Sequence, residues 1–346
     1  MRPASPSECL EAQKKVSAGF DDALKKVLES RAHADTVLMY QMLQYFMGFL
    51  DAGLQPEESG AGGKRFRPSL CLFIAEAYGA RDKVMDAALA IELFHNFTLV
   101  HDDVEDRDEM RRNRPTVWKL WGVNHAINSG DALLLLTSEL ALKTGPVIGL
   151  KLLTAFQEVM EGQYLDFELA DNPLESELVS EENALLMDAK KTGALVAVAA
   201  EVAGIAGLQS AEECASLHGY GMAIGMVFQL ADDYRSVWGT KKDTGKDLHS
   251  DIREHKRTLP FFAARQELTE DKKKRLDELY SLTRQLSEKE IAEALALINT
   301  THAKESVLAL TREHAEKAKE LAASLSVSDE TKSILMGIAD MLVPQD

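Results

Sequence analysis

Two segments of the chain that are apolar on nearly every side each end in a pair of aspartates. Residues 85–100 are typical of a helix with hydrophobic side chains around most of its circumference, and a pair that begins at Asp102 follows. Residues 220–230 show the same pattern and lead into a pair that begins at Asp232. A helix that is hydrophobic all round is usually buried, so we expect both helices inside a bundle. The sequence thus predicts two buried helices that finish in carboxylates.

The rest of the chain is also helical in character. Segments rich in Ala, Leu, Glu, Lys and Met recur, and no alternating stretch of β-branched residues lies between turn signals. From about residue 266 onward, charged and apolar residues alternate at helical spacing, which is typical of solvated outer helices. No repeat or linker marks a domain boundary. The predicted fold is therefore all-α, a single large helical bundle that forms one domain over residues 1–346.

The composition argues against several classes of protein. With a formal net charge of -17, the surface does not suit a general nucleic-acid binder, and an anionic ligand needs a local basic pocket or a metal. The three cysteines are widely spaced, predict neither disulfides nor a zinc site, and fit a reducing cytoplasm. The longest weakly polar stretch, residues 194–208, contains Glu201 and is shorter than the roughly 20 residues of a membrane-spanning helix. We expect a soluble, cytoplasmic protein without a membrane span.

The aspartates suggest metal binding. Asp102 and Asp106 are four residues apart, so on a helix their carboxylates share a face and can hold one cation, whereas Asp103 points to a neighbouring face. Asp232 and Asp233 would repel each other unless they are solvated or bound to metal. Mg²⁺, held by a few carboxylates and completed by phosphates and water, relieves that repulsion, and two such sites facing each other would clamp one diphosphate. A solvated acidic helix end is the alternative.

Two basic clusters need an explanation in so acidic a chain. GGKRFRP at residues 62–68 concentrates three cations beside glycines, and RRNRPT at residues 111–116 follows the first acidic motif. Arginine binds phosphate oxygens through paired hydrogen bonds and lysine acts as a point charge, so diphosphate recognition is a natural use. Salt bridges to neighbouring acidic residues are the alternative for either cluster.

The order of these elements resembles the polyprenyl synthetase family. The resemblance rests on GGKRFRP, HDDVED with RRNRPT, KTG at residues 191–193, and FQLADD with TGK and KRTLP, and it covers roughly residues 62–260. It implies a bundle of the isoprenoid synthase type with a central active-site cavity, assembled as a homodimer. It also implies a short-chain prenyltransferase that condenses isopentenyl diphosphate with an allylic diphosphate, namely dimethylallyl, geranyl or farnesyl diphosphate.

The same resemblance assigns roles to individual residues. Three Mg²⁺ ions, present when substrate is bound, would be held by Asp102, Asp106 and Asp232, with support from Asp103 and Asp233. The allylic diphosphate would be contacted by Arg111, Lys191 and Lys246. Isopentenyl diphosphate would be bound by Lys64, Arg67, His95 and Arg112, and Lys256 would also bind substrate. The reacting carbons would be flanked by Thr192 and Gln229.

These residue types suit the chemistry. Ionising an allylic diphosphate builds negative charge on the leaving group and leaves a carbocation that water would quench. Metal ions and cationic side chains stabilise the first, and apolar walls protect the second. Taken alone, His95 is more typical of a structural helix histidine, and only its place in the motif makes it a ligand. His101 is interpreted as structural.

Two further features concern the metal and the product. Ser236 lies four residues after Asp232, where many family members have a third aspartate. A hydroxyl cannot replace that charge, so we expect weaker metal affinity there, or a water in that position. Phe97 and Phe94 lie five and eight residues before Asp102, where the resemblance places the side chains that limit product length. Large rings there predict a C15 to C20 product, above all geranylgeranyl diphosphate, unless both are ordinary core residues.

Four other interpretations stay open. A farnesyl diphosphate synthase differs only in product length. A class I terpene cyclase would also use an aspartate-rich helix and magnesium, but it would give the basic residues of a second diphosphate site no role. A non-catalytic regulatory subunit of a heteromeric synthase is suggested by Ser236 alone. Magnesium-dependent turnover would exclude the last interpretation, a helical interaction protein.

Overall fold

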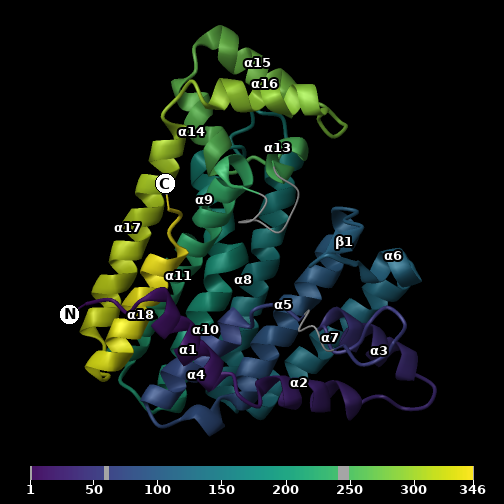
Figure 1. Ribbon diagram of the computed structural model, residues 1–346, viewed down its shortest axis with the longest axis vertical. Coiled ribbons are helices and arrows are strands. Elements are labelled where there is room, and N and C mark those ends of the chain that lie inside the picture. Colours follow the sequence, from purple (N-terminus) through teal and green to yellow (C-terminus); the bar gives the residue numbers. More distant parts are fainter. Residues whose placement is uncertain (1, 58–61, 241–248, 346) are drawn as a thin grey trace. The chain divides into compact units, whose positions relative to one another are not determined.

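The computed structural model describes residues 2–57, 62–240 and 249–345, and nearly all of its regular structure is helical (Figure 1). The all-α prediction is confirmed. The elements in chain order are α1 (Pro6–Val16), α2 (Phe20–Glu29), α3 (Val37–Phe46), α4 (Phe66–Ala77), η1 (Arg81–Lys83), α5 (Met85–Glu105), β1 (Met110–Arg111), β2 (Arg114–Pro115), α6 (Val117–Trp121), α7 (Val123–Lys143), α8 (Pro146–Asp171), α9 (Glu181–Asp188), η2 (Ala189–Gly193), α10 (Ala194–Ala206), α11 (Ala211–Trp238), α13 (Ser250–Arg253), α14 (Leu259–Glu267), α15 (Glu270–Tyr280), α16 (Glu288–Ile298), α17 (Ala303–Ser324) and α18 (Asp329–Leu342). None of the described helices has the length and low polarity needed to cross a bilayer.

The chain divides into two compact units. The first-motif unit, which contains Asp102, comprises residues 7–154 and 199–214. The second-motif unit, which contains Asp232, comprises residues 1–6, 155–198 and 215–346. The expectation of one domain over the whole chain stays a prediction.

Helix α5 forms much of the core of the first-motif unit. It packs extensively against α7 and also against α4. Most of its side chains are buried, and Leu93 and Phe94 are fully enclosed. The sequence dictates this placement, because a helix without a polar face can satisfy its apolar side chains only inside a bundle.

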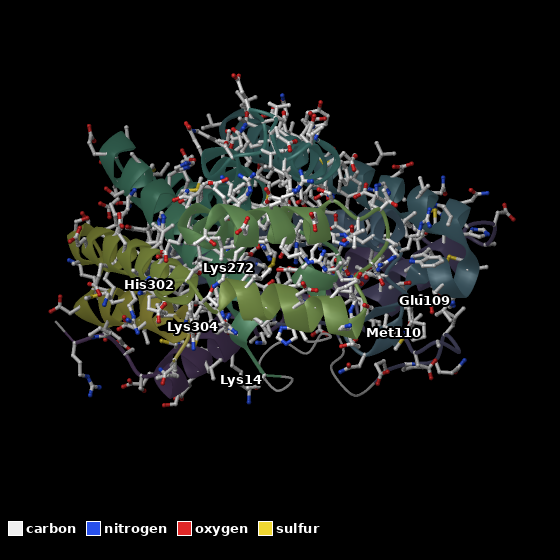
Figure 2. The ribbon with its side chains drawn as sticks, turned by 90° about the horizontal axis from the view of Figure 1, so that it is seen from above. Lys14, Glu109, Met110, Lys272, His302 and Lys304 are labelled. Atoms are coloured by element: carbon white, nitrogen blue, oxygen red, sulfur yellow. The ribbon has the colours of Figure 1, made fainter. Side chains whose placement is uncertain are left out.

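A short antiparallel hairpin follows α5. Strands β1 and β2 pair Arg111 with Arg114, and the two turn residues Arg112 and Asn113 have φ of 52° and 60°. Met110, at the start of β1, is exposed and lies beside Glu109 (Figure 2). Two positive φ angles are typical of the tight turns that join hairpin strands. No strand was predicted here, because two-residue strands cannot show an alternating pattern and arginine is unusual in such a turn.

Glycines allow close helix packing in the second-motif unit. A β-carbon at Gly225 of α11 would lie 2.6 Å from the Cα atom of Gly193, and one at Gly221 would lie 2.5 Å from the carbonyl oxygen of Val196. Any larger residue at either position would collide with backbone. These glycines place η2 and α10 against α11.

The C-terminal helices complete the second-motif unit. Helix α14 packs against α16 and α17, α15 packs against α16, and α17 packs against α18 (Figure 1). Pro260 stands in the first turn of α14, where its missing N–H costs no hydrogen bond. Lys272 of α15 donates a hydrogen bond to Thr300 Oγ1 at 3.3 Å near the start of α17, where Figure 2 labels His302 and Lys304.

Candidate active site

Asp102 and Asp106 lie at the C-terminal end of α5. The amide of Asp106 donates a hydrogen bond to the carbonyl oxygen of Asp102 at 2.8 Å, so helical spacing continues through both residues. Their carboxylates therefore share a face, as their spacing predicted. The C-terminal end of a helix carries a partial negative charge, which disfavours carboxylates and attracts cations. This end of α5 is suited to a cation that binds through oxygen atoms.

Magnesium fits this set of ligands. It binds through one or two carboxylates and keeps the remaining positions for water and substrate phosphates. Across residues 2–57, 62–240 and 249–345, no group of three or more His, Cys, Asp or Glu side chains is placed to hold a metal by itself. A metal ion whose coordination is completed by substrate phosphates does not need such a group.

Asp103 has a different environment from its neighbours. It is only 1% exposed, and Arg111 Nε donates a hydrogen bond to its Oδ1 at 2.5 Å. Burial raises the pKa of Asp103 to about 6, against the lowering effect of the Arg111 guanidinium. Asp103 therefore holds Arg111 in place, and its predicted support of the metal ligands stays a prediction.

The turn of the hairpin positions Arg112. Its Nη1 donates a hydrogen bond to the carbonyl oxygen of Gly62 at 3.1 Å, and a β-carbon on Gly63 would lie 3.0 Å from its guanidinium carbon. Burial lowers the pKa of Arg112 to about 10. A non-glycine residue with φ of 52° costs on the order of 1–3 kcal/mol, and such residues cluster at ligand sites. Gly63, in the first basic cluster, thus leaves space for Arg112 of the second cluster, and Gly62 accepts its hydrogen bond.

His95 and Arg67 form a contact beside these arginines. Arg67 Nη1 and His95 Nε2 are 3.2 Å apart. Burial, followed by the charges of Arg67 and Arg112, holds the pKa of His95 well below its ordinary value. A neutral His95 accepts a hydrogen bond from Arg67 through Nε2 and so orients the guanidinium. Lys64, which is exposed, belongs to the same basic segment.

Salt bridging, the alternative for the basic clusters, is correct for Arg65. Arg65 is 8% exposed and pairs with Glu92 at 2.8 Å and with Asp21 at 2.9 Å. Arg114 likewise has a structural role, because it stacks over the ring of Tyr45 at 4.0 Å and donates to its carbonyl oxygen at 3.1 Å. The clusters therefore mix structural arginines with arginines at the candidate site.

Phe94 and Phe97 lie together on α5, before Asp102. Their ring centroids are 5.6 Å apart, and Phe97 also meets the ring of His101 edge-on at 4.8 Å. His101 Nε2 lies 3.1 Å from the carbonyl oxygen of Ile127, which supports a structural role. A β-carbon at Gly130 would lie only 2.2 Å from that nitrogen, so the glycine makes room for the histidine. The position of Phe97 is thus fixed by packing.

In the second-motif unit, a hydrogen-bonded chain links three predicted residues. Thr192 Oγ1 donates to Gln229 Oε1 at 2.8 Å, and Gln229 Nε2 donates to Asp233 Oδ1 at 2.8 Å. Thr192 lies in η2, a π-helical turn, and such turns occur frequently at functional sites. Lys191, in the same turn, donates to Asp166 Oδ2 at 2.7 Å. Asp232 is exposed one position before the buried Asp233, so it is the member of the pair that ligands can reach.

Two further lysines, Lys256 and Lys246, were also predicted to bind substrate. Lys256 forms an ion pair with Glu254 at 3.2 Å. Lys246, with the TGK segment, lies outside the described residues. Asp166, the partner of Lys191, was not predicted as a site residue, because it lies 25 positions away and belongs to no motif.

Asp188 is a further residue that the sequence analysis missed. It ends α9, is 1% exposed, and neither carboxylate oxygen has a hydrogen-bond partner among the described residues. Burial and then the charge of Asp166 raise its pKa well above the ordinary value. Only its position three residues before Lys191 could have suggested it.

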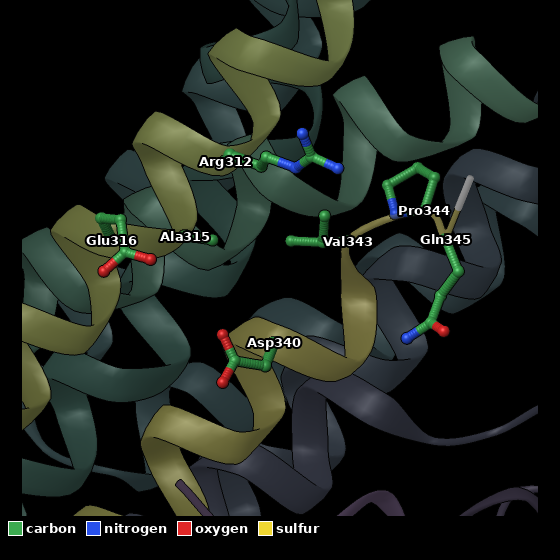
Figure 3. A pocket seen from close by; sticks show the side chains of 7 residues that line it. All are labelled: Arg312, Ala315, Glu316, Asp340, Val343, Pro344 and Gln345. Carbon is green, nitrogen blue, oxygen red and sulfur yellow. The ribbon is translucent and has the colours of Figure 1, made fainter. Parts of the chain in front are cut away.

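The second-motif unit also contains a cavity away from these residues. It has a volume of 460 Å³ and is formed by α17, α18 and the residues that follow α18, with Arg312, Glu316, Asp340 and Gln345 among its lining side chains (Figure 3). No predicted site residue lines it. We therefore assign the candidate site to the residues around the acidic motifs.

The chain belongs to the polyprenyl synthetase family, whose model matches residues 57–298. The resemblance derived from the motifs is thereby confirmed. As a member of this family, the chain is an enzyme, a prenyltransferase. The match includes both acidic motifs and both basic clusters.

Relatives and solved structures agree with this membership. A short chain isoprenyl diphosphate synthase of Methanothermobacter thermautotrophicus is 37% identical over 292 residues, which cover 83% of this chain and 87% of the relative. A geranylgeranyl diphosphate synthase of Saccharolobus solfataricus is 34% identical over 284 residues, 78% of this chain and 82% of the relative. The crystal structure of a polyprenyl synthetase from Streptomyces coelicolor has a TM-score of 0.85 at 32% identity and covers 96% of this chain and 98% of its own. A polyprenyl synthase from Caulobacter crescentus, complexed with calcium and isoprenyl diphosphate, has a TM-score of 0.80 at 26% identity, with 96% and 97% covered.

Proposed function

We propose that this prenyltransferase condenses isopentenyl diphosphate with dimethylallyl, geranyl or farnesyl diphosphate, and that its main product is geranylgeranyl diphosphate. The observation that carries the proposal lies at the end of α5. There an aspartate pair at helical spacing adjoins Asp103, which holds Arg111 at 2.5 Å. Relatives named geranylgeranyl and short chain isoprenyl diphosphate synthases support the product range.

Magnesium is the cofactor in this proposal. Asp102, Asp106 and Asp232 are its ligands, and three ions are present when substrate is bound. When bound, magnesium neutralises the negative charge that develops on the departing diphosphate. The calcium in the Caulobacter crescentus complex supports the use of a divalent cation.

Cationic side chains bind the two substrates. Arg111, Lys191 and Lys246 bind the allylic diphosphate, and Lys256 also binds substrate. Lys64, Arg67, His95 and Arg112 bind isopentenyl diphosphate. The low pKa of His95 suits this role, because the neutral ring accepts from Arg67 and leaves the charge on the guanidinium, which can bind phosphate oxygens in pairs.

The reaction breaks the bond between C1 and oxygen of the allylic diphosphate, and the electron pair leaves with the diphosphate. The double bond of isopentenyl diphosphate then attacks C1, and a proton is lost to the departing diphosphate. Thr192 and Gln229 flank the reacting carbons. The Gln229 amide accepts from Thr192 and donates to Asp233, so its orientation is fixed before substrate binds. Fixed dipoles of this kind stabilise developing positive charge without reorganising.

Phe97 and Phe94 limit the product length. The two rings pack against each other, and Phe97 also packs against the ring of His101. Neither phenylalanine ring can therefore move aside for a longer prenyl chain. A C30 or longer product is therefore not expected. Farnesyl diphosphate is the alternative main product.

The proposal includes a homodimer. In the first-motif unit, α7 and the start of α8 expose large apolar side chains, among them Leu135 at 72%, Leu142 at 71% and Leu150 at 68%. Contiguous exposed apolar side chains mark interaction surfaces. We also place the protein in the cytoplasm, since its three cysteines are buried and unpaired, as is usual in a reducing compartment. Both units belong to one functional domain, because the family match includes parts of each.

The test is incubation with labelled isopentenyl diphosphate and each allylic primer, with and without Mg²⁺, and sizing of the products after phosphatase treatment. We expect magnesium-dependent C15 and C20 alcohols, and we expect Asp102→Ala to lower kcat at least ~100-fold, as the loss of one charge-stabilising group does elsewhere. The proposal fails if no primer is elongated. Cyclised hydrocarbons would then indicate a terpene cyclase, and activity only with an added partner would indicate a regulatory subunit.

A further inference from the structure

Arg65, in the first basic cluster, is bound by three separate elements of the first-motif unit. Its Nη1 donates to Glu92 Oε1 on α5 at 2.8 Å, and its Nε donates to Asp21 Oδ1 on α2 at 2.9 Å. Its Nη2 donates at 2.8 Å to the carbonyl oxygen of Met47, directly after α3. Each nitrogen of the guanidinium thus has a partner on a different element. A lysine could not replace it, because an ammonium group is a single point charge.

The backbone around Arg65 is fixed in the same way. Arg65 directly precedes α4 and has φ of 48°, a left-handed conformation that residues other than glycine seldom adopt. Such a conformation persists only where surrounding contacts impose it. The carbonyl oxygen of Arg65 accepts from Ser69 Oγ at 2.6 Å, and that of Lys64 accepts from Gln13 Nε2 at 2.7 Å. The bend at Arg65 therefore sets the directions in which the side chains of Lys64 and Arg67 leave the backbone.

Glu92 is the buried centre of this arrangement. It is 3% exposed, and Asn96, one turn later on α5, donates to the same Oε1 atom at 2.8 Å. His95 belongs to the same turn, and its Nε2 lies 3.2 Å from Arg67 Nη1. Burial lowers the pKa of Arg67, and the charge of Glu92 opposes that effect. One turn of α5 therefore meets both arginines of the segment, Arg65 through Glu92 and Arg67 through His95.

The guanidinium of Arg65 also supports the second basic cluster. A β-carbon at Gly62 would lie 2.5 Å from Arg65 Nη2 and 2.3 Å from the carbonyl oxygen of Met47, so Gly62 lies directly against the hydrogen bond between them. The carbonyl oxygen of Gly62 in turn accepts from Arg112 Nη1 at 3.1 Å. A displaced guanidinium at position 65 would therefore move the acceptor that holds Arg112.

We propose that Arg65 is a positioning residue for isopentenyl diphosphate: anchored by Glu92 and Asp21, it fixes Arg67 and Arg112 for the substrate without touching it. Each nitrogen of Arg65 already has a protein partner, so its guanidinium is not the group that binds phosphate. The inference rests on the proposed function, because it assumes that isopentenyl diphosphate binds at Arg67 and Arg112. It predicts that the fork shape of the side chain at position 65, and not its charge alone, controls the affinity for this substrate.

The test compares Arg65→Lys and Arg65→Gln with the wild-type enzyme. KM is measured for isopentenyl diphosphate and for dimethylallyl diphosphate, each with the other substrate saturating, and kcat is determined in both series. Because a shift of about 1 Å in a binding group can cost ~100-fold, we expect both variants to raise the KM for isopentenyl diphosphate about 10-fold or more. The KM for dimethylallyl diphosphate should stay within about 2-fold of wild type, because Arg111 is held by Asp103 instead.

A milder pair of variants tests the anchor without removing the arginine. The side chain of Asp21 is 59% exposed, so Asp21→Asn should raise the KM for isopentenyl diphosphate only about 2–3-fold. The matched control is Asp22→Asn, which changes the adjacent exposed aspartate of α2 and should leave both KM values unchanged. If the variants at position 65 do not fold, this pair decides the question, and equal KM values in the two proteins contradict the inference.

Arg81→Lys controls for the loss of an arginine fork elsewhere in the unit. Arg81 Nη2 donates to the carbonyl oxygens of Val16 and Ala18, both at 3.0 Å, so this variant should lose stability in denaturant titrations and keep both KM values. An increase in the KM for isopentenyl diphosphate equal to that of Arg65→Lys would contradict the inference, because the effect would then follow from lost stability. Equal increases in both KM values of Arg65→Lys would contradict it for the same reason.

Two further outcomes separate the inference from the proposed function. If Arg65→Lys keeps the wild-type KM for isopentenyl diphosphate and Arg65→Gln raises it, Arg65 acts through its charge and the inference is wrong. If Arg67→Ala raises that KM but neither variant at position 65 does, the inference is wrong and the proposed function stands. If Arg67→Ala leaves that KM unchanged, the proposed site for isopentenyl diphosphate itself fails.

Discussion

Replacing Phe97 with alanine should lengthen the product. Phe97 is 2% exposed, and its ring meets Phe94 at 5.6 Å and His101 at 4.8 Å. Truncating a buried phenylalanine lowers the free energy of unfolding by about 3–5 kcal/mol. This range includes the loss of the two contacts between aromatic rings. A domain with about 5–15 kcal/mol of stability survives the lower end of this range. We expect the folded variant to add at least one further C5 unit, because the space of the lost ring becomes available to the growing chain.

The assay is the sizing of dephosphorylated products by mass spectrometry, with denaturant titration of both proteins. The matched control is Phe20→Ala, since Phe20 is 1% exposed in the same unit but lies on α2. It should lose comparable stability and keep the wild-type product. If Phe97→Ala is folded and active but makes the wild-type product, Phe97 is an ordinary core residue. If Phe20→Ala lengthens the product too, the effect follows from lost stability.

Three further predictions concern stability and assembly. His95→Gln should make the free energy of unfolding less dependent on pH. Because the pKa of His95 is depressed in the folded protein, only the unfolded state binds its proton as the pH falls below about 6.5, and the folded state loses up to ~1.4 kcal/mol of stability per pH unit. Urea titrations at pH 7.5 and 5.5 measure this difference for both proteins. An equal pH dependence in both proteins would contradict this. Gly225→Ala should lower the free energy of unfolding by about 2–3 kcal/mol, because its Cβ would lie 2.6 Å from backbone. Gly219→Ala should not, because its Cβ would lie 3.3 Å from a leucine methyl group. Equal urea midpoints for the two variants would refute the packing argument. Leu135→Glu should convert the dimer into a monomer in analytical ultracentrifugation, and a wild-type mass would contradict the proposed dimer surface.

The fold could be predicted largely because burial shows directly in the sequence. A helix that is apolar on all sides is stable only inside a bundle, and α5 and α11 lie there. The glycines at positions 193, 221 and 225 allow the close packing of these helices. The hairpin after α5 could not be predicted, because it depends on Arg112 with φ of 52°, a conformation that arginine seldom adopts.

Residues of the candidate site could be predicted where they lie close together in the sequence, but not where they come from distant segments. Asp102 and Asp106 share a face through helical spacing alone. Asp103 was grouped with them, but burial and Arg111 give it a different environment. Asp166 and Asp251, which accept hydrogen bonds from Lys191 and Ser236, come from other segments, and so does Asp188, whose charge acts on Asp233. Only the folded chain brings them near the motif residues.

The central claim is tested most directly by a crystal structure of the enzyme with Mg²⁺, isopentenyl diphosphate and an unreactive thio analogue of dimethylallyl diphosphate. The account predicts magnesium ligated by Asp102, Asp106 and Asp232, with the isopentenyl diphosphate bound by Arg67 and Arg112. Diphosphates bound elsewhere, or bound without any metal on these aspartates, would contradict it.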